Sequence, residues 1–229
     1  MSEDVRRMFA SISDRYDLLN SVLSLGVHHS WRRKAVKKSG AQKGMHVLDC
    51  ATGTGDLAIE YKKAVGKKGE VVGTDFCAEM LAPAPDKAAK QQLDIRWEVA
   101  DAMNLPYEDD TFDISSIAFG IRNVDDPGTA LSEMARVVRP GGKVMILEFG
   151  QPYGVMKYPF RWHSKYVIPI LGGWISGNKK AYQYLPETSA SFPAGQHFVS
   201  LMKKTGRFQS VEIVSLMQGI AYIYSGTVH

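Results

Sequence analysis

The sequence predicts an α/β fold built on a doubly wound, mostly parallel sheet, and two features predict it. From residue 46 onward, short apolar runs alternate with helical stretches, which is typical of parallel strands joined by helical crossovers. The first run leads into the glycine-rich turn Thr52–Gly55, which suits a strand that enters a helix. Two later apolar runs separated by Met217–Gly219 indicate a hairpin. We therefore expect seven strands, with an antiparallel strand at the C-terminal end.

The expected strands follow the apolar runs. They are His46–Cys50, Glu70–Asp75, Asp94–Val99, Phe112–Ala118, Lys143–Phe149, Val211–Leu216 and Ile220–Ser225. One helix is expected after Gly55 and another from Asp126, an acidic cap that precedes Pro127. Pro83 and Pro85 would each cost about 3 kcal/mol inside a helix. We therefore expect a break there and a new helix near Pro85.

The N-terminal part is predicted to be helical. Apolar residues recur at helical spacing from Val5 to Leu23, which predicts one amphipathic helix, and Ser30–Lys38 reads as a second, basic helix. No signal peptide and no apolar stretch of membrane-spanning length is visible.

Composition narrows the class of protein. A chain of 229 residues with 45% hydrophobic and 23% charged residues suits one globular domain and excludes low complexity. The net charge of +4 is milder than nucleic-acid-binding proteins usually carry, so no nucleic-acid partner is expected. Two cysteines, Cys50 and Cys77, cannot form a disulfide framework and indicate a reducing compartment. We therefore expect a cytoplasmic enzyme.

The turn after the first strand has the chemistry of a nucleotide-type site. Gly53 and Gly55 let the backbone approach a ligand, and Asp75 closes the second strand where an acid can accept ribose hydroxyls. Dinucleotides and S-adenosylmethionine both fit this pattern, and a packing turn is the structural alternative. Asp49 suits a cationic ligand and would repel a pyrophosphate, while Ala58 replaces the third glycine of the dinucleotide pattern. These details favour S-adenosylmethionine.

Motifs after the later strands strengthen that interpretation. Several segments resemble the post-strand motifs of class I methyltransferases, whose fold is Rossmann-like: Asp101-Ala102, Leu105–Tyr107, Thr111–Asp113 and Arg136–Lys143. The resemblance covers about 100 residues.

A more particular resemblance spans nearly the whole chain. It rests on Tyr16–Asn20 with Leu23, Ser24, His28 and Trp31, on Phe119–Val124, on Val137–Gly142 through Leu147-Glu148, and on Tyr182, Tyr184 and Leu185 with Ser189 and Pro193. These patterns resemble the ubiquinone/menaquinone biosynthesis C-methyltransferases. The departures are conservative or peripheral: Leu19 where Met is usual, Arg139 for Lys, and Gly150 for Ser.

The resemblance implies methyl transfer from S-adenosylmethionine to a ring carbon of an isoprenoid quinol, with demethylmenaquinol the expected acceptor and a ubiquinone precursor an alternative. The expected cofactor-binding residues are Asp49, Thr52, Gly53, Thr54, Gly55, Asp75, Phe76, Asp101, Ala102 and Ala118. The expected catalytic residues are Arg122, Asn123 and Tyr16. Arg122 stays charged, so it would stabilise a phenolate or hold a water rather than act as a base.

On this interpretation, residues 1–229 form a single methyltransferase domain with four parts. These are an N-terminal helical lid (1–43), a cofactor-binding core (44–150), a substrate cap (151–190) and a C-terminal helix and hairpin (191–229). Residues 151–185 carry five basic and eight aromatic residues and no acidic ones. That composition is typical of a segment at a membrane interface, and equally of a plain cap over an apolar pocket.

Several alternatives stay open at this point. Another small hydrophobic acceptor, an RNA substrate or a module that only binds a nucleotide would each fit part of the pattern. Arg122 could be a loop arginine that pairs with a carboxylate, and Tyr16 a packing residue. Adjacent His28 and His29 point apart and have no third ligand at useful spacing, so no metal is expected. A homodimer is left open, as is location at the inner face of the membrane.

Overall fold

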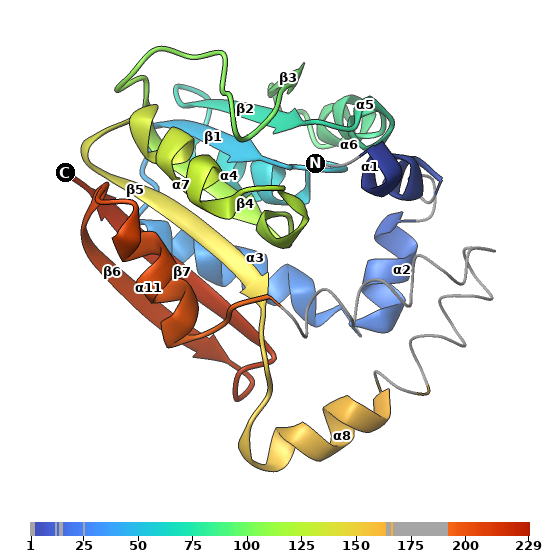
Figure 1. Cartoon of the computed structure of the whole chain (residues 1–229). Coiled ribbons are helices and arrows are strands. Elements are labelled where there is room, and N and C mark those ends of the chain that lie inside the picture. The colour runs from blue at the N-terminus through green and yellow to red at the C-terminus, as the bar shows by residue number, and fades with distance from the viewer. Residues whose placement is uncertain (1–2, 12, 14–15, 25, 164–165, 167–191) are drawn as a thin grey trace.

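A seven-stranded sheet forms the centre of the protein, seen here in a computed structural model that describes residues 3–11, 13, 16–24, 26–163, 166 and 192–229 (Figure 1). The strand order is β3-β2-β1-β4-β5-β7-β6. The strands are β1 (His46–Cys50), β2 (Glu70–Asp75), β3 (Arg96–Val99), β4 (Phe112–Ala118), β5 (Val138–Phe149), β6 (Phe208–Leu216) and β7 (Ala221–Val228). The first five pair in parallel, whereas β7 is antiparallel to both β5 and β6. The predicted fold class and C-terminal hairpin are therefore confirmed.

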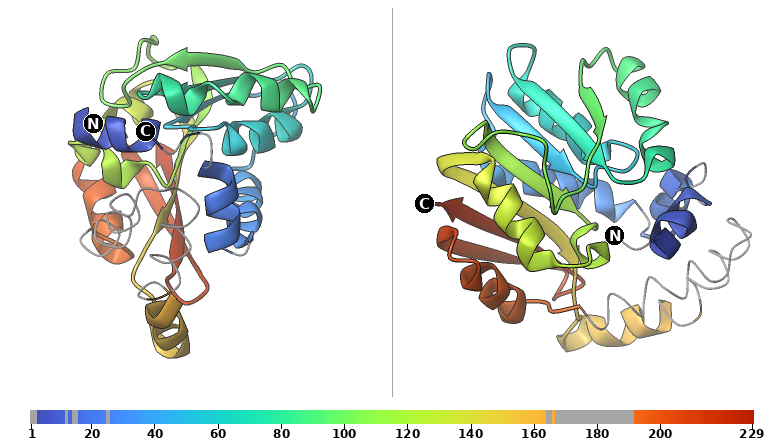
Figure 2. Two further views of the ribbon diagram at one scale, coloured as in Figure 1. Left: turned by 90° about the vertical axis from the view of Figure 1, so that its right-hand side faces the viewer. Right: turned by 45° about the horizontal axis from the view of Figure 1, so that its top comes forward.

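Helices cover both faces of this sheet. On one face lie α3 (Val27–Ser39) and α4 (Asp56–Val65), and on the other α7 (Pro127–Arg136) and α11 (Gln196–Lys204), as the edge-on view in Figure 2 shows. Two short helices, α5 (Ala78–Leu81) and α6 (Ala84–Ala89), follow β2. The helices α1 (Glu3–Ala10) and α2 (Tyr16–Leu23) lie beyond the carboxyl ends of the parallel strands. Helix α8 (Lys157–Trp162) stands away from the sheet.

The N-terminal prediction of one long helix is wrong. Helix α1 ends at Ala10, and α2 begins only at Tyr16. The hydroxyls of Ser11 and Ser13 donate to the carbonyls of Met8 and Ala10, and such side-chain bonds to the backbone compete with a continuing helix. The predicted break between the helices after β2 is confirmed, because Pro83 precedes α6 and Pro85 lies in its first turn.

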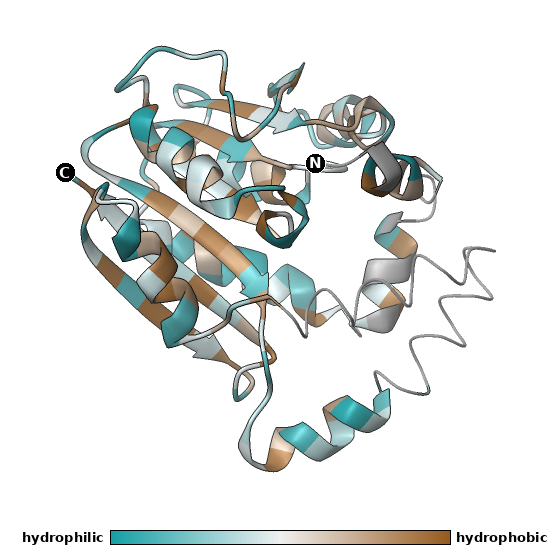
Figure 3. Cartoon of the chain, viewed as in Figure 1, coloured by the Kyte–Doolittle hydropathy of each residue, from teal (hydrophilic) through white to brown (hydrophobic). Residues whose placement is uncertain are grey.

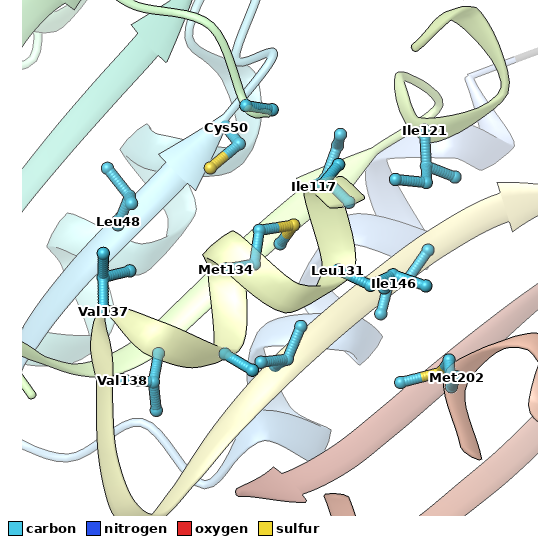
Figure 4. Close-up of a cluster of buried hydrophobic side chains, with 14 of the residues drawn as sticks. Leu48, Cys50, Ile117, Ile121, Leu131, Met134, Val137, Val138, Ile146 and Met202 are labelled. Atoms are coloured by element: carbon cyan, nitrogen blue, oxygen red, sulfur yellow. The ribbon is translucent and has the colours of Figure 1, made fainter. Parts of the chain in front are cut away.

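The core has one half on each side of the sheet. In Figure 4, Leu48, Ile117 and Ile146 of the central strands pack beneath Leu131 and Met134 of α7. On the other side, Trp31, Ala35 and Val36 of α3 join a second cluster that includes Tyr61 of α4. Helix α3 therefore belongs to the layers of the core, and a lid formed by the N-terminal region stays a prediction.

Hydropathy follows the layers: apolar residues gather on the central strands and on the inner sides of the helices (Figure 3). None of the residues of helix α8 is buried. Within the described ranges, no helix has both the length and the apolar character needed to cross a membrane.

Candidate active site

The turn between β1 and α4 takes a backbone conformation that glycine favours. Ala51, Gly53 and Gly55 all have positive φ angles, of 46°, 56° and 85°. A Cβ at Gly55 would lie 2.6 Å from Cη2 of Trp97, so this position also needs glycine for close packing. The backbone conformation of the turn therefore depends on its glycines.

Asp49 lies buried beneath this turn. Its carboxylate accepts hydrogen bonds from the hydroxyls of Thr52 (2.6 Å) and Ser116 (2.7 Å), which joins the turn to β4. Burial raises the pKa of Asp49 to about 6. Asp49 and Thr52 therefore support the turn from below, and neither lines the pocket above it.

Asp75 holds the turn at the end of β2. One carboxylate oxygen accepts the N–H of Gly53 at 2.8 Å and the other accepts the N–H of Cys77 at 2.9 Å. Burial raises the pKa of Asp75, and these two backbone donors oppose that rise. Each oxygen keeps a second lone pair, so the carboxylate can still accept ligand hydroxyls.

A pocket opens at the carboxyl ends of the parallel strands, where open α/β sheets place their ligands. Six of the predicted cofactor-binding residues line it: Gly53, Asp75, Phe76, Asp101, Ala102 and Ala118. Asn123 lines it as well. Phe9 of α1 and Phe119 add apolar surface, and the sequence analysis assigned neither residue to the site. One end of the pocket therefore offers carboxylates, and the remainder is mainly apolar.

Thr54 faces away from the pocket and joins a network with the N-terminal helices. Its hydroxyl donates to Asp17 of α2 at 2.5 Å, and Lys87 of α6 donates to the same Asp17 at 2.5 Å and to Thr54 at 3.2 Å. Lys87 also pairs with Asp56 at the start of α4. This Lys87 network (Asp17, Thr54, Asp56 and Lys87) ties α2 to the turn.

Arg122 lies behind the pocket wall rather than in the pocket lining. Its Nη1 donates to Oε1 of Glu148 (2.5 Å) and to the carbonyl of Phe119 (2.7 Å), and its guanidinium carbon lies 5.4 Å from the ring centre of Phe149. Burial raises the pKa of Glu148, and Arg122 opposes that rise. Arg122 therefore pairs with a carboxylate, as one of the alternatives in the sequence analysis proposed. Its side chain is buried, however, and not exposed on a loop.

Two further residues discussed in the sequence analysis are Tyr16, a predicted catalytic residue, and His28. Tyr16 begins α2, but its side chain lies outside the described residues, so its place at the site stays a prediction. His28 is buried, its Nδ1 lies 3.1 Å from a guanidinium nitrogen of Arg32, and burial lowers its pKa to about 4. Across the part of the chain that the structure describes, no three His, Cys, Asp or Glu side chains gather as a metal site would need.

Comparison with known proteins decides the family. A model described as the ubiE/COQ5 methyltransferase family matches residues 1–228. The chain belongs to this family. It is 55% identical over 230 residues to the ubiquinone/menaquinone biosynthesis C-methyltransferase UbiE of Bdellovibrio bacteriovorus, covering 99% of this chain and 96% of that protein. It is 44% identical over 221 residues to the demethylmenaquinone methyltransferase of Thermus thermophilus, covering 96% of this chain and 99% of that protein.

Solved structures give the same fold. A S-adenosylmethionine-dependent methyltransferase from Aquifex aeolicus superimposes with a TM-score of 0.65 at 22% identity, covering 86% of this chain and 89% of that one. At this identity the similarity concerns the fold alone. Together with the family match, it confirms the class I fold, and the protein is a S-adenosylmethionine-dependent methyltransferase.

The residues of the pocket fit that cofactor, which supplies a methyl group on a positively charged sulfur. Asp75 and Asp101 offer carboxylates and Ala102 is small, while Gly53 brings backbone to the pocket lining with space for a Cβ only in van der Waals contact with Cε of Met80, at 3.4 Å. A substituent at Gly53 would therefore narrow the space above the turn.

Proposed function

We propose that this methyltransferase adds its methyl group to a ring carbon of an isoprenoid quinol, converting demethylmenaquinol to menaquinol. The observation that carries the proposal is the nearly full-length similarity to relatives whose names state this reaction class. The mainly apolar pocket lining supports it, because a quinol ring with its isoprenoid tail is a hydrophobic acceptor.

The chemistry requires the reduced ring. Methylation at carbon needs an electron-rich carbon, and a phenolate supplies it by pushing electrons to the ortho position. A phenol has a pKa near 10, so the site must ease removal of this proton. The ring carbon then forms a bond to the methyl group as the carbon–sulfur bond breaks, and the ring loses a proton to restore aromaticity. Two opposite charges disappear in this step, which a dry pocket favours.

The proposal assigns distinct roles to the predicted residues. Asp75 and Asp101 would bind the cofactor from the polar end of the pocket. Asn123, which lines the pocket, would orient the quinol hydroxyl. Arg122 would favour the phenolate from behind the wall, and Tyr16 is its proposed partner in easing removal of the phenol proton, which a water molecule would carry away.

The proposal is tested with the purified enzyme, S-adenosylmethionine and chemically reduced demethylmenaquinol. We expect a product heavier by one methyl group, with the oxidised quinone and a sterol as unreactive controls. Methylation of the sterol but not of the quinol would refute the proposal.

The residue roles need a second measurement. Arg122→Ala should lower single-turnover methylation by about 100-fold while cofactor affinity stays near that of the wild type, the scale expected when a preorganised donor is lost. Arg122→Lys should recover only part of the rate, since lysine supplies charge without the planar fork. A wild-type rate in Arg122→Ala would remove this residue from the chemical step.

We also propose that the segment around α8 rests on a membrane of anionic lipids, which would give access to a lipid-soluble acceptor. Large apolar side chains are exposed there, among them Tyr158 (74%) and Trp162 (62%), beside Lys157 and Arg161. Aromatic and basic side chains together are typical of the interface between lipid headgroups and water. Much of the predicted contact segment, residues 151–185, lies outside the described residues.

Co-sedimentation with phosphatidylglycerol vesicles tests this contact. The wild type should pellet with the vesicles, less so as salt is raised, and a Lys157→Gln/Arg161→Gln variant should pellet less. A matched control replaces Lys203 and Lys204, two exposed lysines of α11, and should behave like the wild type. Equal pelleting of all three proteins, or of none, would favour the alternative in which this segment covers an apolar pocket and does not bind a membrane.

A further inference from the structure

The segment Ala118–Asn123, here called the acceptor wall, holds a conformation that its own sequence does not favour. Ala118, Phe119, Gly120 and Asn123 all line the pocket. Phe119 has a φ angle of 58°, in the left-handed region that a bulky residue rarely adopts. Such a conformation persists only where surrounding structure restrains it.

Two neighbouring residues of β5 supply that restraint. The N–H of Phe119 donates to the carbonyl of Leu147 at 2.7 Å. The carbonyl of Phe119 accepts Nη1 of Arg122, and the same nitrogen donates to Oε1 of Glu148. Glu148 is itself held, because its Oε1 also accepts the N–H of Phe149 at 2.8 Å. Both polar groups of Phe119 are therefore connected to β5, one of them through Arg122.

Stability alone does not account for this buried pair. The side chains of Arg122 and Glu148 are 3% and 1% exposed, and among the described residues neither Nε of Arg122 nor Oε2 of Glu148 has a hydrogen-bond partner. Removing two charges from water costs about as much as their attraction returns, so a buried pair contributes little net stability. Its remaining effect is to select one conformation of the groups that it touches.

We infer that Glu148 is a positioning residue for methyl transfer: it fixes the guanidinium of Arg122 and thereby the acceptor wall against which the acceptor ring lies. Glu148 does not line the pocket, so it acts through Arg122 and Phe119 rather than on the substrate. The inference rests on the function proposed above, because the oriented group is the acceptor ring. It predicts that loss of Glu148 impairs the binding and orientation of the acceptor and leaves cofactor binding unchanged.

Hydrogen exchange tests the restraint without any substrate. In Glu148→Gln, the amides of Phe119 and Asn123 should exchange about 10-fold faster or more, because their local opening becomes easier. The control is Asp113→Asn, which weakens the Asp113–Arg139 pair near the starts of β4 and β5, at the ends of these strands far from Glu148. It should leave these two amides unchanged. Wild-type exchange in Glu148→Gln would overturn the inference.

A double variant separates positioning from folding. Replacing both members of a buried ion pair by apolar residues of similar size is often neutral for stability. Glu148→Met/Arg122→Met should therefore melt close to the wild type and still show faster exchange at Phe119. A double variant with protected amides would overturn the inference, even if Glu148→Gln alone failed to fold.

Kinetics then separate this inference from the proposed function. Glu148→Gln should raise the KM for the quinol and lower single-turnover methylation about 10- to 100-fold, the scale of a misplaced reactant, with cofactor affinity within about threefold. The effects of Glu148→Gln and Arg122→Met should not add, because one residue acts through the other. A normal rate in Glu148→Gln beside a slow Arg122→Met would overturn the positioning role alone. Normal rates in both would also remove Arg122 from the reaction.

Discussion

The carboxylate of Asp75 should serve both the fold of the cofactor turn and the binding of the cofactor, and Asp75→Ala separates the two effects. The substitution leaves the N–H groups of Gly53 and Cys77 without their acceptors. A buried unpaired donor costs about 1–3 kcal/mol, and water from the pocket offsets part of this cost. We therefore expect unfolding to become easier by about 2–3 kcal/mol, which lowers the melting temperature by roughly 4–12 °C.

Cofactor affinity should fall further than the loss of stability requires. Hydrogen bonds to a charged group contribute about 1.5–3 kcal/mol, so the Kd for S-adenosylmethionine should rise roughly 10- to 100-fold. Isothermal titration at a temperature where the variant is folded measures this effect, with Asp94→Ala, an exposed aspartate before β3, as the control. An unchanged Kd in folded Asp75→Ala would refute the role of this carboxylate in binding.

Three further predictions concern the surroundings of the turn. Burial raises the pKa of Asp49 to about 6, so the folded protein retains a proton that the unfolded chain loses near pH 4. Stability should therefore fall by up to about 3 kcal/mol as pH rises from about 4 to 6, and Asp49→Asn should abolish this fall in denaturant titrations. Lys87→Met removes the cation of the Lys87 network and should destabilise the protein by about 1–2 kcal/mol, with faster hydrogen exchange in α2. Unchanged exchange in α2 would contradict the role of Lys87 in holding this helix to the turn. Gly55→Ala should cost about 1–3 kcal/mol or more because its Cβ meets Trp97, whereas Gly206→Ala, with similar φ and open space, should cost less in the same unfolding experiment.

Local sequence signals predicted most of the fold. The bounds of β1, β2 and β4 agree with their apolar runs, because central parallel strands are buried on both faces. Strand β5 begins at Val138, five residues earlier than predicted from Lys143. Pro140 and the two glycines after it resemble a loop, and they form an irregularity within β5. Gly141 has a φ angle of 79°, and the pairing with β4 shifts register between its first two pairs.

From the sequence, a site residue could be predicted only where its own motif and its place after a strand indicate its role. Asp75 is the last residue of β2 and Asp101 comes two residues after the end of β3, so their place at the pocket could be inferred from strand order. Glu148 belongs to a motif that the sequence analysis quoted, but its pairing with Arg122 depends on the register of β4 and β5. Lys87 carries no motif at all, and only the three-dimensional arrangement places it beside Asp17.

The attachment points of residues 150–195 have an evolutionary consequence. Gly150 donates its N–H to the carbonyl of Ile220, and Gly195 donates its N–H to the hydroxyl of Tyr224, so both ends of this stretch are fastened beside the same strand, β7. Neither attachment involves the turn at Gly53 or the carboxylate of Asp75, which belong to β1, α4 and β2 at the other side of the sheet order. We therefore expect the sequence between the two attachment points to diverge among related enzymes while the turn and its carboxylate stay as they are.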